Sequence, residues 1–184
     1  IKGLEHNGHD YIAPALEQGA TAILYSDNLK FKDQKLKLQI KVKNLVEIET
    51  KVPRRDLGLL WAAWYDFPSS KLKIIGITGT DGKTTTTNLL YHILKMAGRK
   101  VGMVSTINAR FGDREVDTGF HVTNPEPELL QRLLSEMAGE GLEYVCLEVT
   151  SHGIDQERIA GVKFYGAVIT NVTHEHLDYH KTYE

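Results

Sequence analysis

The chain has 184 residues, of which 41% are hydrophobic and 25% are charged, and its formal net charge is -2. This balance is ordinary for a soluble globular protein, and the net charge gives no reason to expect nucleic acid or an anionic membrane as the main partner. No segment approaches the roughly 20 continuous apolar residues that span a bilayer, and the single cysteine, Cys146, excludes an internal disulfide. We therefore expect a cytoplasmic protein with no nucleic-acid partner and no membrane insertion.

The first part of the chain predicts short helical and strand elements. Residues 11–18 predict a helix and residues 20–25 predict a strand. Residues 35–43 alternate between apolar and mostly lysine positions, which is typical of a half-buried strand. The basic face of that strand has two interpretations, a solvated face that resists aggregation or a nucleic-acid patch.

A domain boundary is predicted after the next helix. Residues 54–66 form an amphipathic pattern, and we expect Trp61 and Trp64 to pack in a core. The Phe-Pro-Ser-Ser sequence that follows ends the helix. The boundary predicts a small N-terminal α/β domain over 1–68 and a second domain over 69–184.

The second part alternates strands with helices, which predicts an α/β fold with a doubly wound, mostly parallel sheet. Strands are expected over 72–78, 100–104, 144–149 and 167–170, and helices over 84–97 and 126–138. Such sheets bind ligands at the carboxyl ends of their strands. The loops expected there are 79–85, 105–125, 150–158 and 171–180.

The sequence IIGITGTDGKTTTTNLL, residues 74–90, predicts a strand, a phosphate-binding loop and a helix. Glycines permit the tight turn that points backbone N–H groups at an anion, and the helix adds its positive end. Lys83 would contact the β- and γ-phosphates of ATP, and Thr84 would ligate Mg²⁺. The general spacing places a glycine where this chain has Ile77, whereas the glycine stands one place earlier, at Gly76. A glycine-rich turn without a ligand and a P-loop phosphotransferase stay open as alternatives.

Two further segments carry chemistry at strand ends. In LEVTSHGIDQERI, residues 147–159, Glu148 ends a strand and is a candidate Mg²⁺ ligand, or else a salt-bridged carboxylate. In TNVTHEHLDYH, residues 170–180, the histidine spacing does not match a common zinc site, and no cysteine joins it.

These segments together resemble the Mur ligase superfamily. The loop ITGTDGKTT resembles the GxTGTxGKTT loop of that family, whose first glycine also stands one place early, although Asp81 replaces a common Asn. EVTSHGIDQER resembles the matching segment of the MurE type, with Thr150 in place of the commoner Ser. THEHLDYH resembles the DHLDxH turn, and HVTNPEPELLQ resembles the TTPE segment, with Asn124 in place of Thr. KGLEHNGHDYIAPALEQGATAILYSD resembles the first domain of the MurE type.

The resemblance implies an ATP-dependent amide ligase of peptidoglycan synthesis. A ligase of this type adds the third amino acid to UDP-MurNAc-L-Ala-D-Glu through an acyl phosphate, with ATP and Mg²⁺. We expect the protein to be a monomer. The implied catalytic residues are Lys83, Glu148 and His176, and the implied metal ligands are Thr84, Glu148 and His176. The implied nucleotide-binding residues are Gly79, Thr80, Asp81, Gly82, Lys83, Thr84, Thr85 and Asn171. The implied substrate-binding residues are Leu4, Glu5, His6, Thr123, Asn124, Thr150, Gln156 and Arg158.

We also expect the chain to be cut at both ends. The family's carbamylated lysine and its amino-acid-selecting domain would lie beyond residue 184, so these residues alone should not turn over. The amino acid that is added is therefore not predicted. The alternatives are another Mur ligase, a folylpolyglutamate synthase-like ligase, and a nucleotide-binding module that does not ligate.

Overall fold

The computed structural model describes residues 8–26, 45–117, 124–174, 179 and 181–182. The chain divides into two compact units, Ile1–Leu57 and Gly58–Glu184, each with its own core. This division lies inside a helix and before residue 68, and the domain limits 1–68 and 69–184 stay a prediction. No helix in the described ranges is long and apolar enough to cross a membrane.

The first unit contains a small two-stranded parallel sheet. The elements are η1 (Gly8–Tyr11), α1 (Ile12–Glu17), β1 (Ala22–Ser26) and β2 (Val46–Thr50). Ile12, Ile23 and Tyr25 are buried and form its core, because the apolar positions of the helix and strand face each other. The predicted helix at 11–18 and strand at 20–25 are confirmed, and the predicted strand at 35–43 lies outside the described residues.

Helix α3 (Pro53–Trp64) buries small residues rather than its tryptophans. Gly58 and Ala62 are its buried residues, and a Cβ on Gly58 would lie 2.7 Å from the Ala160 Cβ. Trp64 is 78% exposed, so the expectation that it packs in a core is wrong. The close approach on the small-residue face leaves no space there for an indole.

The second unit is built on a six-stranded sheet with the order β6-β5-β4-β7-β3-β8. The strands are β3 (Lys73–Thr78), β4 (Val101–Val104), β5 (Asn108–Phe111), β6 (Arg114–Asp117), β7 (Tyr144–Glu148) and β8 (Phe164–Ile169). Four adjacent strands run parallel to one another, and these are β4, β7, β3 and β8. The strands β5 and β6 form an antiparallel hairpin that pairs with β4 at one edge of the sheet. The predicted α/β class with a mostly parallel sheet is confirmed.

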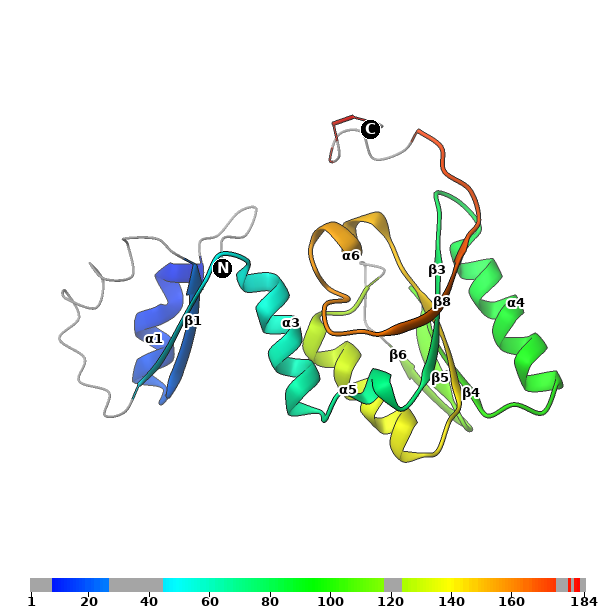
Figure 1. Cartoon of the computed structure of the whole chain (residues 1–184), viewed down its shortest axis with the longest axis horizontal. Coiled ribbons are helices and arrows are strands. Elements are labelled where there is room, and N and C mark those ends of the chain that lie inside the picture. Colours follow the sequence, from blue (N-terminus) through cyan, green and yellow to red (C-terminus); the bar gives the residue numbers. More distant parts are fainter. Residues whose placement is uncertain (1–7, 27–44, 118–123, 175–178, 180, 183–184) are drawn as a thin grey trace. The chain divides into compact units, whose positions relative to one another are not determined.

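Helices cover both faces of this sheet (Figure 1). The helices are η2 (Pro68–Ser70), α4 (Lys83–Met96), α5 (Pro127–Gly139) and α6 (Ser151–Asp155). On α5, Leu130, Leu133, Leu134 and Met137 are buried at the spacing of one helical face, in the larger core. On α4, Tyr91 belongs to a second core with residues of β3, β4 and β7. The sheet is therefore doubly wound, as predicted.

The register of the parallel strands brings their carboxyl ends to one edge. Ile77 of β3 pairs with Glu148 of β7, Val104 of β4 pairs with Leu147, and Thr78 pairs with Ile169 of β8. Side chains that follow these strands therefore meet, although they come from distant parts of the sequence.

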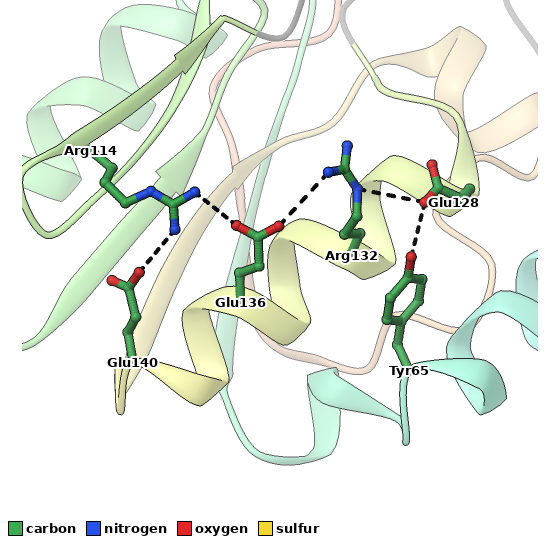
Figure 2. A network of polar contacts seen from close by, with 6 residues as sticks. All are labelled: Tyr65, Arg114, Glu128, Arg132, Glu136 and Glu140. Carbon is green, nitrogen blue, oxygen red and sulfur yellow. Dashed lines mark hydrogen bonds and ion pairs between the residues drawn. The ribbon is translucent and has the colours of Figure 1, made fainter.

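The solvent side of α5 carries a chain of ionic contacts, which we call the α5 ion-pair network (Figure 2). Arg114 of β6 lies 3.1 Å from both Glu136 and Glu140. Arg132 lies 3.5 Å from Glu128 and 3.9 Å from Glu136, and the Tyr65 hydroxyl donates to Glu128 at 2.9 Å. Partial burial and the bond to Glu128 raise the pKa of Tyr65. Water screens such contacts, so each stabilises the fold by about 0–1 kcal/mol.

Candidate functional site

The loop between β3 and α4 makes the tight backbone turn that typically surrounds a phosphate. Gly79 has φ +139° and Gly82 has φ +77°, a region that glycine adopts without strain. A Cβ on Gly79 would lie 2.1 Å from Thr170 Oγ1 and 2.8 Å from the Asn171 carbonyl oxygen. The segment that follows β8 therefore lies directly against the loop.

Asn171 holds this loop in shape. Its carbonyl oxygen accepts from the Thr80 N–H at 3.1 Å, and its Oδ1 accepts from the Asp81 N–H at 2.9 Å. The Thr170 hydroxyl donates to the Asp81 carbonyl at 2.6 Å. The structure thus places Asn171, predicted to lie near the nucleotide, beside the predicted nucleotide loop.

The loop delivers positive charge at the start of α4. Lys83 begins the helix, and its Nζ donates to the carbonyl oxygens of Gly79 at 2.8 Å and Thr80 at 2.6 Å. The first N–H groups of a helix have no partner inside the helix and form its positive end. Thr84 and Thr85 lie in this first turn, where an anion can accept from both the backbone and the ammonium group.

Glu148 is a buried carboxylate at the end of β7. It is 1% exposed, and its Oε1 accepts from the hydroxyls of Thr84 and Thr106, each at 2.9 Å. Its Oε2 accepts from the Thr106 N–H at 3.1 Å. A buried charge is tolerated when hydrogen bonds satisfy it, as they do here. The sequence did not predict Thr106 as a site residue, although it lies in the loop 105–125 that the sheet topology marked.

Asn124 and Thr150 continue the cluster behind Glu148. Asn124 Nδ2 donates to the Glu148 carbonyl oxygen at 2.8 Å, and its Oδ1 accepts from the Thr150 N–H and hydroxyl, both at 2.8 Å. The Thr150 hydroxyl in turn accepts from the Gly153 N–H at 3.0 Å and caps α6. We call Thr84, Thr106, Asn124, Glu148 and Thr150 the Glu148 cluster.

The other predicted substrate residues lie on the far side of this cluster. Arg158 donates to the Asn124 carbonyl at 2.8 Å and to Gln156 Oε1 at 2.9 Å, and it pairs with Glu126 at 3.2 Å. Gln156 Nε2 donates to the Tyr179 hydroxyl at 3.3 Å. The structure therefore brings Asn124, Thr150, Gln156 and Arg158 together, and it adds Tyr179, which the sequence did not single out.

Five predicted site residues lie outside the described residues, and these are Leu4, Glu5, His6, Thr123 and His176. Within the described part of the chain, no group of three or more His, Cys, Asp and Glu side chains could hold a metal ion. The Glu148 carboxylate and the Thr84 hydroxyl are nevertheless hard oxygen donors beside the predicted phosphate loop, and Mg²⁺ prefers donors of this type. The predicted roles of all these residues stay predictions.

Comparisons with known proteins point to one family. The family model described as the Mur ligase middle domain matches residues 77–184. Curated relatives named UDP-N-acetylmuramoyl-L-alanyl-D-glutamate--2,6-diaminopimelate ligase are 41% identical in Bacteroides thetaiotaomicron and 42% identical in Bacteroides fragilis, over 184 residues. The match takes in 100% of this chain and 36% of each relative.

Solved structures show the same fold. A structure of a UDP-N-acetylmuramoyl-L-alanyl-D-glutamate--2,6-diaminopimelate ligase matches 88% of this chain and 35% of its own, with a TM-score of 0.65 at 22% identity. The MurF ligase of Thermotoga maritima in complex with ADP matches 100% of this chain and 36% of its own, with a TM-score of 0.54 at 25% identity.

Proposed function

Because the chain belongs to the Mur ligase family, we propose that it takes part in the ATP-dependent ligation of an amino acid to UDP-MurNAc-L-Ala-D-Glu. The observation that carries this proposal is the contact between Thr84 and Glu148. It joins the predicted phosphate loop to a buried carboxylate at the carboxyl end of the next parallel strand. The names of the relatives make 2,6-diaminopimelate the first amino acid to test.

The reaction needs an activated carboxylate, because a carboxylate is a poor electrophile. A carboxylate oxygen of the dipeptide attacks the γ-phosphorus of ATP, and ADP leaves. The amine of the incoming amino acid then attacks the acyl carbon, phosphate leaves, and the nitrogen loses a proton to give the amide. Each step moves negative charge onto phosphate oxygens, so the protein contributes position and positive charge.

The residues of this chain have distinct parts in that scheme. The first turn of α4 and the Lys83 ammonium bind the β- and γ-phosphates. Thr84 and Glu148, with His176 as the predicted third ligand, would hold Mg²⁺, which neutralises phosphate charge when it is bound. Thr150, Gln156 and Arg158 orient the UDP-MurNAc-dipeptide, since a guanidinium suits an anionic group of that substrate.

We further infer that the protein acts as a monomer in the cytoplasm, where ATP and UDP-linked substrates are available. Mass measurement by light scattering at several concentrations tests the first statement. Fractionation with an antibody against the protein tests the second.

The test of the reaction uses the full-length protein. It is incubated with UDP-MurNAc-L-Ala-D-Glu, ATP, Mg²⁺ and a panel of amino acids, and both phosphate release and product mass are followed. We expect a mass gain of one amino acid. We also expect Lys83→Ala to lower the rate by about 100-fold or more, because the variant removes the positive charge that would contact the transferring phosphate.

Lys95→Ala is the matched control, since it removes a lysine from the last turn of the same helix. Its rate should equal that of the unchanged protein. ATP binding without any ligation would instead support a nucleotide-binding module, and ligation to a different carboxylate would reassign the substrate.

A further inference from the structure

The side chain of Asn124 is buried and fully engaged with protein atoms on its oxygen. Asn124 is 1% exposed. An amide oxygen has two lone pairs, and both have donors here, the Thr150 N–H and the Thr150 hydroxyl, each at 2.8 Å. Its Nδ2 donates to the Glu148 carbonyl at 2.8 Å. A substrate group that donates to this amide oxygen would have to displace one of these bonds, and the burial of the side chain leaves little of it accessible to a ligand.

Packing also restricts movement of this side chain. A Cβ on Gly153 would lie 2.0 Å from Asn124 Oδ1 and 2.6 Å from its Cγ. The first turn of α6 therefore approaches the amide as closely as a glycine allows. The side chain cannot turn toward a ligand unless α6 also shifts.

Asn124 joins the two halves of the site. Through Nδ2 it fixes the backbone of Glu148, whose carboxylate contacts Thr84 in the phosphate-loop helix. Through Oδ1 it fixes Thr150, and its own carbonyl accepts from Arg158 at 2.8 Å. The nucleotide side and the substrate side of the site thus share this one residue.

We propose that Asn124 is a positioning residue that sets Glu148 and the pair Thr150 and Arg158 in a fixed relation, and that its side chain does not contact the UDP-linked substrate. This inference rests on the proposed ligase function. It gives Asn124 a different part from the substrate contact that the sequence predicts. It follows that one change at Asn124 should weaken both sides of the site together.

The test replaces Asn124 by an isosteric residue that lacks the amide donor. In the full-length protein, Asn124→Asp removes the bond to the Glu148 carbonyl and places an oxygen against it. We expect the KM for the UDP-MurNAc-dipeptide and the Mg²⁺ concentration for half-maximal rate each to rise about tenfold or more, as when a partner that orients a metal ligand is lost. Loss of a direct substrate contact would raise the KM alone and would overturn the proposal.

The matched control is Gln131→Glu, an amide-to-acid change on α5. Gln131 is 0% exposed, and its Nε2 donates to the Ala160 carbonyl at 3.4 Å. This variant should lower the melting temperature as Asn124→Asp does, with KM and Mg²⁺ dependence within about twofold of the unchanged protein. If it reproduces both rises, Asn124 acts only through general stability and the proposal is wrong.

A second measurement does not depend on activity. Hydrogen exchange in the protein without ligands should show that Asn124→Leu, which also removes the Oδ1 acceptor of the Thr150 N–H and hydroxyl, accelerates the amides of Thr150 and Gly153 by about tenfold more than amides of β4. Uniform acceleration would overturn the positioning role. If the unchanged protein ligates nothing while this local effect is present, the proposed function fails and the structural link at Asn124 stands.

Discussion

The Glu148 cluster and the α5 ion-pair network are both built from charged and hydrogen-bonding side chains, but the charged groups of the two differ in exposure. Glu148 is 1% exposed, whereas the Arg114 side chain is 54% exposed and that of Glu136 is 31% exposed. In the buried cluster the donors are hydroxyls and amides, and in the network they are mainly guanidinium groups (Figure 2). The difference indicates that burial, rather than the number of charges, decides how strongly the loss of a contact changes stability or activity.

The largest effect is expected when the charge of Glu148, at the centre of the Glu148 cluster, is removed. Glu148→Gln keeps an oxygen for the two threonine hydroxyls but removes the charge, so ligation by the full-length protein should fall about 100-fold or more. The free energy of unfolding without ligands should change by no more than about 2 kcal/mol, because the lower cost of burying a neutral amide offsets the bond that Nε2 cannot accept from the Thr106 N–H. Rate assays and urea unfolding measure the two quantities. Glu136→Gln in the network is the control and should leave the rate unchanged; equal losses in the two variants would contradict the comparison.

The packing of the buried cluster supplies the second change. Gly153→Ala places a methyl group against the Asn124 amide and should lower the free energy of unfolding by about 2 kcal/mol. Gly139→Ala on α5 is the control, because no atom outside its chain neighbours and its own helix backbone lies within 4 Å of the added Cβ. That control should stabilise the protein by about 0.5 kcal/mol, since alanine suits a helix better than glycine. Urea denaturation of both variants checks the opposite signs, and a neutral Gly153→Ala would mean that α6 moves freely.

The buried thiol of Cys146 should make the free energy of unfolding depend on pH in the alkaline range. Burial raises the pKa of Cys146 from 9.0 to about 12, so the folded thiol stays protonated while the unfolded thiol ionises. The stabilisation is complete below pH 9 and is lost as pH rises, by about 1.4 kcal/mol per pH unit up to the folded pKa. Unfolding curves at pH 8, 9 and 10 measure this slope, which Cys146→Ala should remove. A slope that persists in that variant would assign it to other groups, such as Tyr65 in the network.

The smallest effect is expected on the exposed side. Arg114→Ala removes two ion pairs of the network and should lower the free energy of unfolding by less than about 1 kcal/mol. Salt at 1 M should reduce the difference further, because the Debye length falls to about 3 Å. Thermal melts with and without added salt test both statements. A loss of about 3 kcal/mol that is insensitive to salt would place this network in the same class as the Glu148 cluster.

Much of the fold could be predicted because its signals are local. The strand β3, the glycine loop and α4 follow from a single run of sequence, and the spacing of Leu130, Leu134 and Met137 identifies α5. The sequence does not predict the hairpin β5–β6, because its strands are short and lie within the range 105–125, which is expected to be a loop. The available signal is the Gly112-Asp113 pair at its turn, where Gly112 adopts φ +57°.

The partners within the site could not be predicted in the same way. The sequence placed Glu148 and Thr150 at the end of a strand, but their hydrogen bonds depend on which strands are neighbours. Because β7 lies between β4 and β3, Thr106 reaches Glu148 from one side and Thr84 from the other. Asn124 likewise joins the cluster from a segment whose position no local pattern specifies.

The hydrogen bond between Asp81 and Asn171 can form only after the later of the two residues has been synthesised. These residues are 90 positions apart, and β3 pairs with β7 and β8, both of which leave the ribosome later. At about 5–20 residues per second, the loop waits on the order of ten seconds for the segment that holds it. We expect nascent chains that stop before Thr170 not to bind a nucleotide tightly, because the predicted phosphate loop is synthesised well before the segment that holds its backbone.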